Sequence, residues 1–125
     1  MNYLWVAIGS ACGGMARYAC SGLGALVSET FPWGTLFVNV LGSLIIGALV
    51  VLIPPDGRFL IADARAFLMI GICGGFTTFS SFSLETLNLA RNGEWASAVS
   101  YTIGSVVLCL VAVWLGYYGA TAMGR

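Results

Sequence analysis

The residues best suited to chemistry gather in one short stretch, residues 76–82, with the sequence Phe-Thr-Thr-Phe-Ser-Ser-Phe directly after Gly74 and Gly75. Between Thr77 and Ser83 there are five hydroxyl side chains inside an otherwise apolar segment. A hydroxyl group in hydrocarbon finds no water, so this cluster predicts either a protein interface or a hydrated path. The neighbouring glycines favour a helix that is broken near Gly74-Gly75.

A broken helix would supply two kinds of ion site. The end before the break presents unpaired carbonyls, which suit a desolvated alkali cation, and the new helix start presents N–H groups, which suit an anion. Phe79 and Phe82 lie three residues apart and share a helical face. Their ring edges are positive and can point at an anion, although simple packing is the alternative for this pair.

Other polar side chains could extend such a site. Asn39 offers two N–H donors and one acceptor, and Thr35 lies on its helical face. Ser97, Tyr101 and Ser105 recur at four-residue spacing and form one hydroxyl stripe. Asn39 could simply join helices by hydrogen bonds, or it could line a narrow polar track together with the stripe and the hydroxyl cluster.

Arg17 carries a charge inside the first apolar stretch. On insertion scales, an arginine at membrane depth costs about 2.5 to 3.5 kcal/mol. Two interpretations stay open: the side chain reaches an interface or pairs with an acid such as Glu85, or it draws anions toward a pore.

Composition defines the class of protein. Hydrophobic residues make up 59% of the 125 residues, charged residues 8%, and the mean hydropathy is +0.95. Because one span needs about 20 apolar residues, we expect an all-α membrane protein with four transmembrane helices in one domain, residues 1–125. The expected spans are residues 3–27, 34–53, 62–91 and 95–123.

The same composition argues against several functions. Five arginines balance five acidic residues, and the chain has no histidine. It therefore lacks a basic patch for nucleic acid and the imidazole groups of many catalytic and metal sites. The four cysteines show no metal-ligand spacing, and no Walker-type sequence is present, so we expect no enzyme.

Arginine placement sets the expected orientation in the membrane. Arg58, Arg65 and Arg125 fall on one face and Arg91 on the other, and Arg17 can reduce the difference further. A bias this small predicts dual topology, with two copies packed antiparallel.

These features together predict a small-ion channel or transporter that prefers anions. Two alternatives come from other classes. A small multidrug-resistance-type exchanger needs a carboxylate in its first span, and no acidic residue precedes Glu29. A structural membrane subunit would account for the glycine-rich faces, but not for hydroxyls, Asn39 and two phenylalanines at one depth.

Three segments resemble the Fluc-type (CrcB) fluoride channels: residues 13–18 (GGMARY), 34–39 (GTLFVN) and above all 74–85 (GGFTTFSSFSLE). The resemblance covers the whole chain. Tyr18, where tryptophan is usual, and Ser81, where threonine is common, are small departures that keep the chemistry.

The resemblance implies a passive fluoride channel in the bacterial inner membrane, built as an antiparallel homodimer with two pores. Fluoride would leave the cytoplasm through it, which reduces fluoride toxicity. A structural Na⁺ would be held by the backbone carbonyls of Gly74 and Thr77. The implied fluoride path is lined by Asn39, Phe79, Phe82, Thr78, Ser80, Ser81, Tyr101 and Ser105, with Arg17 toward a vestibule.

Overall fold

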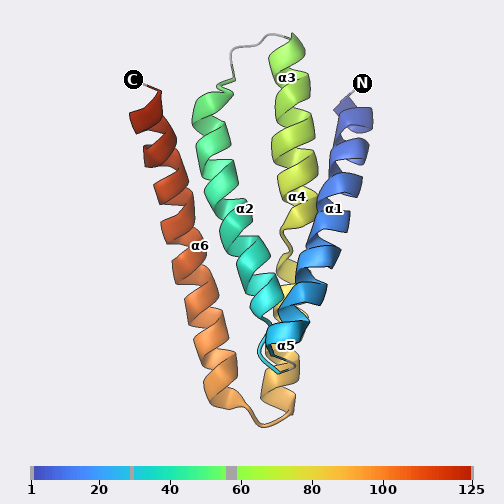
Figure 1. The fold of residues 1–125 in the computed structure, drawn as a ribbon, viewed down its shortest axis with the longest axis vertical. Coiled ribbons are helices and arrows are strands. Elements are labelled where there is room, and N and C mark those ends of the chain that lie inside the picture. Colours follow the sequence, from blue (N-terminus) through green and yellow to red (C-terminus); the bar gives the residue numbers. More distant parts are fainter. Residues whose placement is uncertain (1, 29, 56–58, 125) are drawn as a thin grey trace.

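The computed structural model describes residues 2–28, 30–55 and 59–124, and these residues form helices without any strand. The helices form columns that run alternately up and down, so that the start of the first column and the end of the last lie at the same end of the molecule (Figure 1). The third column consists of four consecutive segments. The helices are α1 (Asn2–Val27), α2 (Trp33–Leu52), α3 (Phe59–Arg65), the π-helical segment η1 (Ala66–Cys73), α4 (Gly74–Phe76), α5 (Phe79–Arg91) and α6 (Trp95–Met123).

Three stretches are long and apolar enough to cross a membrane: Trp33–Leu52, Ile61–Arg91 and Trp95–Met123. α1 has 26 residues and is therefore also long enough, at about 1.5 Å per residue, but it is less apolar and contains Arg17. The expected all-α class is confirmed for the described residues. Arg58, Arg125 and Glu29, on which the expected orientation and one alternative partly depend, lie outside them.

The columns associate as two close pairs, α2 with α6 and α1 with η1 and α4. Glycines make both approaches possible. A Cβ atom built on Gly116 of α6 would overlap the carbonyl oxygen of Leu44 and lie 3.0 Å from the amide nitrogen of Ala48. On the other pair, a Cβ on Gly13 would overlap the carbonyl of Ile72. Backbone thus meets backbone, as small residues allow in membrane helix pairs.

The third column is interrupted after α4. Gly74 is itself helical, with φ −64° and ψ −38°, whereas Thr77 (φ −86°, ψ 157°) and Thr78 (φ −154°, ψ 123°) are extended. The extended residues therefore begin two positions after Gly75. Gly75 serves a different purpose, because a Cβ there would lie only 2.6 Å from the carbonyl oxygen of Ser10 on α1.

We predict that Gly116→Ala destabilises the protein by about 1 to 3 kcal/mol, because the new methyl group meets backbone atoms that cannot turn aside. Gly119→Ala is the matched control on the same helix, since nothing lies within 4 Å of its Cβ position. Thermal unfolding of the detergent-solubilised protein measures both. Equal melting temperatures for the two variants would contradict this account of the α2–α6 contact.

Candidate functional site at the interrupted helix

The interruption is held by one side chain from a different helix. Asn39 lies on α2, and its Oδ1 accepts a hydrogen bond from the amide nitrogen of Thr78 at 2.9 Å. Its Nδ2 donates to the carbonyl oxygen of the same residue at 3.2 Å. The amide side chain thus satisfies both backbone groups of an extended residue that the helical pattern has left without partners.

The two threonines of the interruption also turn their hydroxyls to the backbone. Thr77 donates through its amide and its Oγ1 to the carbonyl of Cys73, at 3.0 and 2.9 Å. Thr78 is the N-cap of α5, where its Oγ1 accepts from the amide of Ser81 at 3.2 Å. An N-cap threonine of this kind stabilises a helix start by about 1 kcal/mol.

This rearrangement changes the partners of three carbonyls. In a continuous α-helix the amide of Thr78 would bond to the Gly74 carbonyl, and the amide of Ser81 to the Thr77 carbonyl. Those amides instead donate to Asn39 and to the Thr78 hydroxyl. The intervening Gly75 carbonyl accepts from Nε of Arg17 at 3.1 Å. Gly74 and Thr77 are therefore left without the amide donors that an α-helix would give their carbonyls.

A cavity of about 410 Å³ lies beside the interruption, and we call it the break cavity. Asn39, Thr77 and Thr78 line it from the interruption side, and Ser105 lines it from α6. Its full lining is Asn39, Gly42, Ser43, Ile46, Met69, Cys73, Gly74, Thr77, Thr78, Phe79, Phe82, Ser105, Val106, Cys109 and Leu110.

Ser105 is the polar group of this cavity that stands out. Only 6% of the residue is exposed, and its Oγ has no hydrogen-bond partner among the described residues. An unpaired buried hydroxyl costs roughly 1 to 3 kcal/mol, so Ser105 is suited to bind a water molecule or an ion in this cavity.

The two phenylalanines of the cavity differ in exposure. Phe82 is 8% exposed and Phe79 is 77% exposed, with ring centroids 5.4 Å apart. Phe82 also lies 5.0 Å from the ring of Tyr101. Phe79 therefore marks the open side of the break cavity and Phe82 the closed side.

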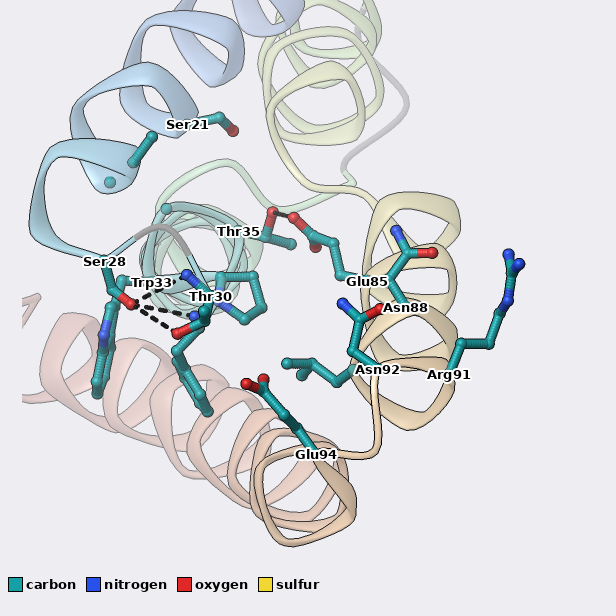
Figure 2. Close-up of a pocket in the computed structure, with 16 residues that line it drawn as sticks. Ser21, Ser28, Thr30, Trp33, Thr35, Glu85, Asn88, Arg91, Asn92 and Glu94 are labelled. Atoms are coloured by element: carbon teal, nitrogen blue, oxygen red, sulfur yellow. Dashed lines mark hydrogen bonds between the residues drawn. The ribbon is translucent and has the colours of Figure 1, made fainter.

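A second cavity, of about 560 Å³, lies where the α1–α2 and α5–α6 connections meet (Figure 2). We call it the end cavity. Its polar lining includes Thr35, Glu85, Asn88, Asn92 and Glu94, and the side chain of Arg91 extends away from the other labelled side chains.

A hydrogen-bonded layer connects the linings of the two cavities. Glu85 accepts from Oγ1 of Thr35 through Oε2 at 2.9 Å and from the hydroxyl of Tyr101 through Oε1 at 3.0 Å. Thr35 and Glu85 line the end cavity, while Tyr101, 1% exposed, packs on Phe82 of the break cavity. We call these three residues the Glu85 layer.

The structure brings most of the predicted site residues to one place. Seven of them line the break cavity: Asn39, Gly74, Thr77, Thr78, Phe79, Phe82 and Ser105. Tyr101 lies one layer away, and Ser80 and Ser81 lie on the first turn of α5, outside that lining. Arg17 also lies outside it and bonds the Gly75 carbonyl instead of pairing with Glu85.

Sequence reasoning missed two participants. It named Glu85 only as a possible partner of Arg17, although an acidic residue three positions after Phe82 lies on the same face of its helix. It also passed over Gly42, which lies three positions after Asn39 and lines the break cavity. Helical spacing from the residues already selected would have indicated both.

The chemistry available here comes from neutral donors and carbonyls. The described residues contain no group of three or more histidine, cysteine, aspartate or glutamate side chains that could hold a metal ion. A cation at the break would therefore rely on backbone carbonyls. An anion could use the Ser105 hydroxyl, the second Nδ2 hydrogen of Asn39 and the ring edge of Phe82.

Comparison with known proteins places this arrangement in a family. Residues 4–117 match the family described as CrcB-like protein, Camphor Resistance (CrcB). A protein of Opitutus terrae named fluoride-specific ion channel FluC is 57% identical over 123 residues, which cover 97% of this chain and 93% of the relative. Proteins of the same name from Rhodospirillum rubrum and Paramagnetospirillum magneticum are 53% and 54% identical over 127 residues, covering 100% of this chain and 98% and 99% of theirs.

We predict that Asn39→Ala removes the slow hydrogen exchange of the Thr78 amide and costs about 1 to 3 kcal/mol of stability, because two backbone groups lose their partners. Asn88→Ala, on the exposed side of α5, is the control. Hydrogen exchange followed by mass spectrometry, together with thermal unfolding, makes the measurement. Unchanged protection at Thr78 in Asn39→Ala would show that Asn39 does not hold the interruption.

Proposed function

The chain belongs to the CrcB-like family, and we propose on that premise that it is a passive, fluoride-selective ion channel. Relatives named fluoride-specific ion channel match it over nearly their whole length. The structural observation that carries the proposal is the break cavity, where an unpartnered buried hydroxyl, an amide and two phenylalanine rings gather beside an interrupted helix.

Fluoride is small and strongly hydrated, so a path for it must replace water with donors at close range. Ser105 brings a hydroxyl without a protein partner among the described residues. Asn39 uses one Nδ2 hydrogen on the Thr78 carbonyl and keeps the other for an ion. The edge of the Phe82 ring adds a weak positive surface in a largely buried position.

Selectivity follows from how these donors are held. Asn39 is fixed by two bonds to Thr78, and Phe82 is packed against Tyr101. A rigid set of few donors compensates dehydration only for an ion of matching size, as filters do for cations. Chloride is larger and would not reach all of the donors together.

The hydroxyls of the Glu85 layer would allow an anion to pass close to the Glu85 carboxylate. The hydroxyls of Thr35 and Tyr101 point at Glu85 in this structure. Both hydroxyls can rotate toward a passing fluoride and then return to the carboxylate. Between passages their bonds hold the Glu85 charge in place, so that it does not block the path.

Fluoride export through such a channel needs no energy source such as ATP. Neutral HF crosses lipid, ionises in a near-neutral cytoplasm and is trapped there as fluoride. With the cell interior negative, each fluoride that leaves gains about 2.3 kcal/mol per 100 mV. A passive channel in the bacterial inner membrane therefore suffices to lower cytoplasmic fluoride and its toxicity.

We also propose that the working unit is an antiparallel homodimer of this chain. Phe79 is 77% exposed at the open side of the break cavity, where a second copy would cover it and close the path. A partner in inverted orientation agrees with the small arginine bias of the sequence.

A central Na⁺ fits the backbone of the interruption. The Gly74 and Thr77 carbonyls have lost their α-helical amide donors to Asn39 and to the Thr78 hydroxyl, and carbonyl oxygens suit a desolvated alkali ion. Such an ion would supply positive charge at the helix end and join the two copies. Arg17 donates a hydrogen bond to the neighbouring Gly75 carbonyl, which would keep that oxygen out of the cation's ligand set.

Neither alternative gains support from a particular observation. The exchanger needs an acid in its first span, and α1 contains none. A structural subunit would have no need for the unpartnered hydroxyl of Ser105 in a cavity.

We predict that liposomes containing the purified protein lose fluoride rapidly and chloride at least a hundred times more slowly. Ser105→Ala should slow fluoride loss about tenfold or more, because one hydrogen bond to a charged ion is worth about 1.5 to 3 kcal/mol. Ser100→Ala, exposed on the same helix, is the matched control. A fluoride electrode makes the measurement, and fluoride loss no faster than from empty liposomes would refute the channel.

We predict that reporter fusions at the C-terminus detect both orientations of this chain in the bacterial inner membrane, in comparable amounts. Two added lysines near the C-terminus should shift the population to one orientation, because the present charge bias is small. A wild-type population with a single orientation would contradict an antiparallel homodimer.

A further inference from the structure

We propose that Gly42 is a positioning residue that fixes the direction of the Thr77 carbonyl through direct contact with the Thr77 methyl group. The proposal rests on the proposed function, because the Thr77 carbonyl matters there as a ligand of the central cation. Gly42 lies on α2, is buried, and lines the break cavity beside Thr77.

The contact is confined to a single methyl group. A Cβ atom built on Gly42 would overlap Cγ2 of Thr77. The next nearest atoms are Cδ2 of Phe76 at 3.5 Å and Cβ of Thr77 at 3.7 Å, which are ordinary contact distances. The Thr77 methyl thus occupies the space that any side chain at position 42 would need.

Gly42 differs in this respect from the other closely packed glycines of the described ranges. Gly47 and Gly116 face backbone carbonyls across the α2–α6 contact, and Gly13 and Gly75 face backbone across the α1 contact. Those neighbours are backbone atoms, which no substitution can remove. The neighbour of Gly42 can be removed by a substitution, because the obstructing atom belongs to the side chain of Thr77.

Thr77 cannot turn its methyl away without a loss elsewhere. Its Oγ1 donates to the Cys73 carbonyl at 2.9 Å, and its amide donates to the same oxygen at 3.0 Å. Rotation about the Cα–Cβ bond that moved Cγ2 off Gly42 would also move Oγ1 off that carbonyl. The threonine side chain is therefore held on both of its branches.

Asn39 and Gly42 act together from adjacent turns of α2. Asn39 fixes Thr78 by two hydrogen bonds, while Gly42 fixes Thr77 by shape. The Thr77 carbonyl lies between these two restraints. A methyl group added at position 42 would push Thr77 and turn its carbonyl, so the affinity for Na⁺ would fall.

The test is a double-mutant cycle of Gly42→Ala and Thr77→Ser. Serine removes Cγ2 but keeps the hydroxyl and the carbonyl, so the double variant has room for the alanine methyl. The melting temperature of each purified dimer is measured as Na⁺ replaces N-methylglucamine at constant ionic strength. Fluoride efflux is recorded in parallel, and Gly104→Ala, with nothing within 4 Å of its Cβ position, is the control.

We expect Gly42→Ala to raise the Na⁺ concentration at half-stabilisation tenfold or more, and Thr77→Ser in the double variant to return it to within about threefold of wild type. Gly104→Ala should leave it near the wild-type value. Thr77→Ser alone should raise it by less than Gly42→Ala does, because it removes the methyl group that contacts Gly42 but keeps the hydroxyl on the Cys73 carbonyl. If Gly42→Ala cannot be purified, Thr77→Ser carries the test: a raised Na⁺ midpoint that the alanine methyl of the double variant lowers again supports the proposal, and an unchanged midpoint in Thr77→Ser overturns it.

Three further results would overturn the inference. Gly42→Ala could lower the melting temperature with an unchanged Na⁺ midpoint, which is a purely structural effect. The double variant could keep the defect, which would place the conflict elsewhere than at the methyl group. The wild-type protein could conduct fluoride without any Na⁺-dependent stability, and then the cation role fails while the fluoride channel stands.

Discussion

The whole arrangement depends on one constraint: backbone polar groups inside a membrane must find partners within the protein. Two extended residues, Thr77 and Thr78, break the helical pattern at membrane depth. Asn39 satisfies both backbone groups of Thr78, and Arg17 satisfies the Gly75 carbonyl. The Gly74 and Thr77 carbonyls, which receive no hydrogen bond from this network, are the ones suited to a cation. The ion chemistry of the site therefore follows from which backbone groups at the interruption have hydrogen-bond partners.

The same network gives the polar side chains their order along the column. Thr35 and Asn39 lie one turn apart on α2, and Phe82 and Glu85 lie one turn apart on α5. Thr35 and Glu85 line the end cavity, whereas Asn39 and Phe82 line the break cavity. Tyr101 connects the two levels by its bond to Glu85 and its contact with Phe82. A path through the protein would therefore alternate between hydroxyl and amide donors and aromatic rings, with the only carboxylate of the Glu85 layer held by two donors.

Helical spacing in the sequence identified the helix faces that carry Asn39, Phe82 and Ser105, and the structure brings those three residues to one cavity. The predicted position of the break was less accurate, because the sequence indicated Gly74-Gly75 and the extended residues are Thr77 and Thr78. Glycine is ambiguous in such a place: it can permit a break or a close approach, and Gly75 serves the approach to Ser10. The partners Thr35 and Glu85, 50 positions apart, and Arg17 and Gly75, 58 positions apart, depend on packing that no local pattern reports.

The most direct measurement of the central claim is the reversal potential of currents through the purified protein in a planar bilayer. With a tenfold fluoride gradient and equal chloride on both sides, a fluoride-selective channel should reverse near the fluoride equilibrium potential, about 59 mV from zero. A reversal potential close to zero, with currents present, would contradict fluoride selectivity.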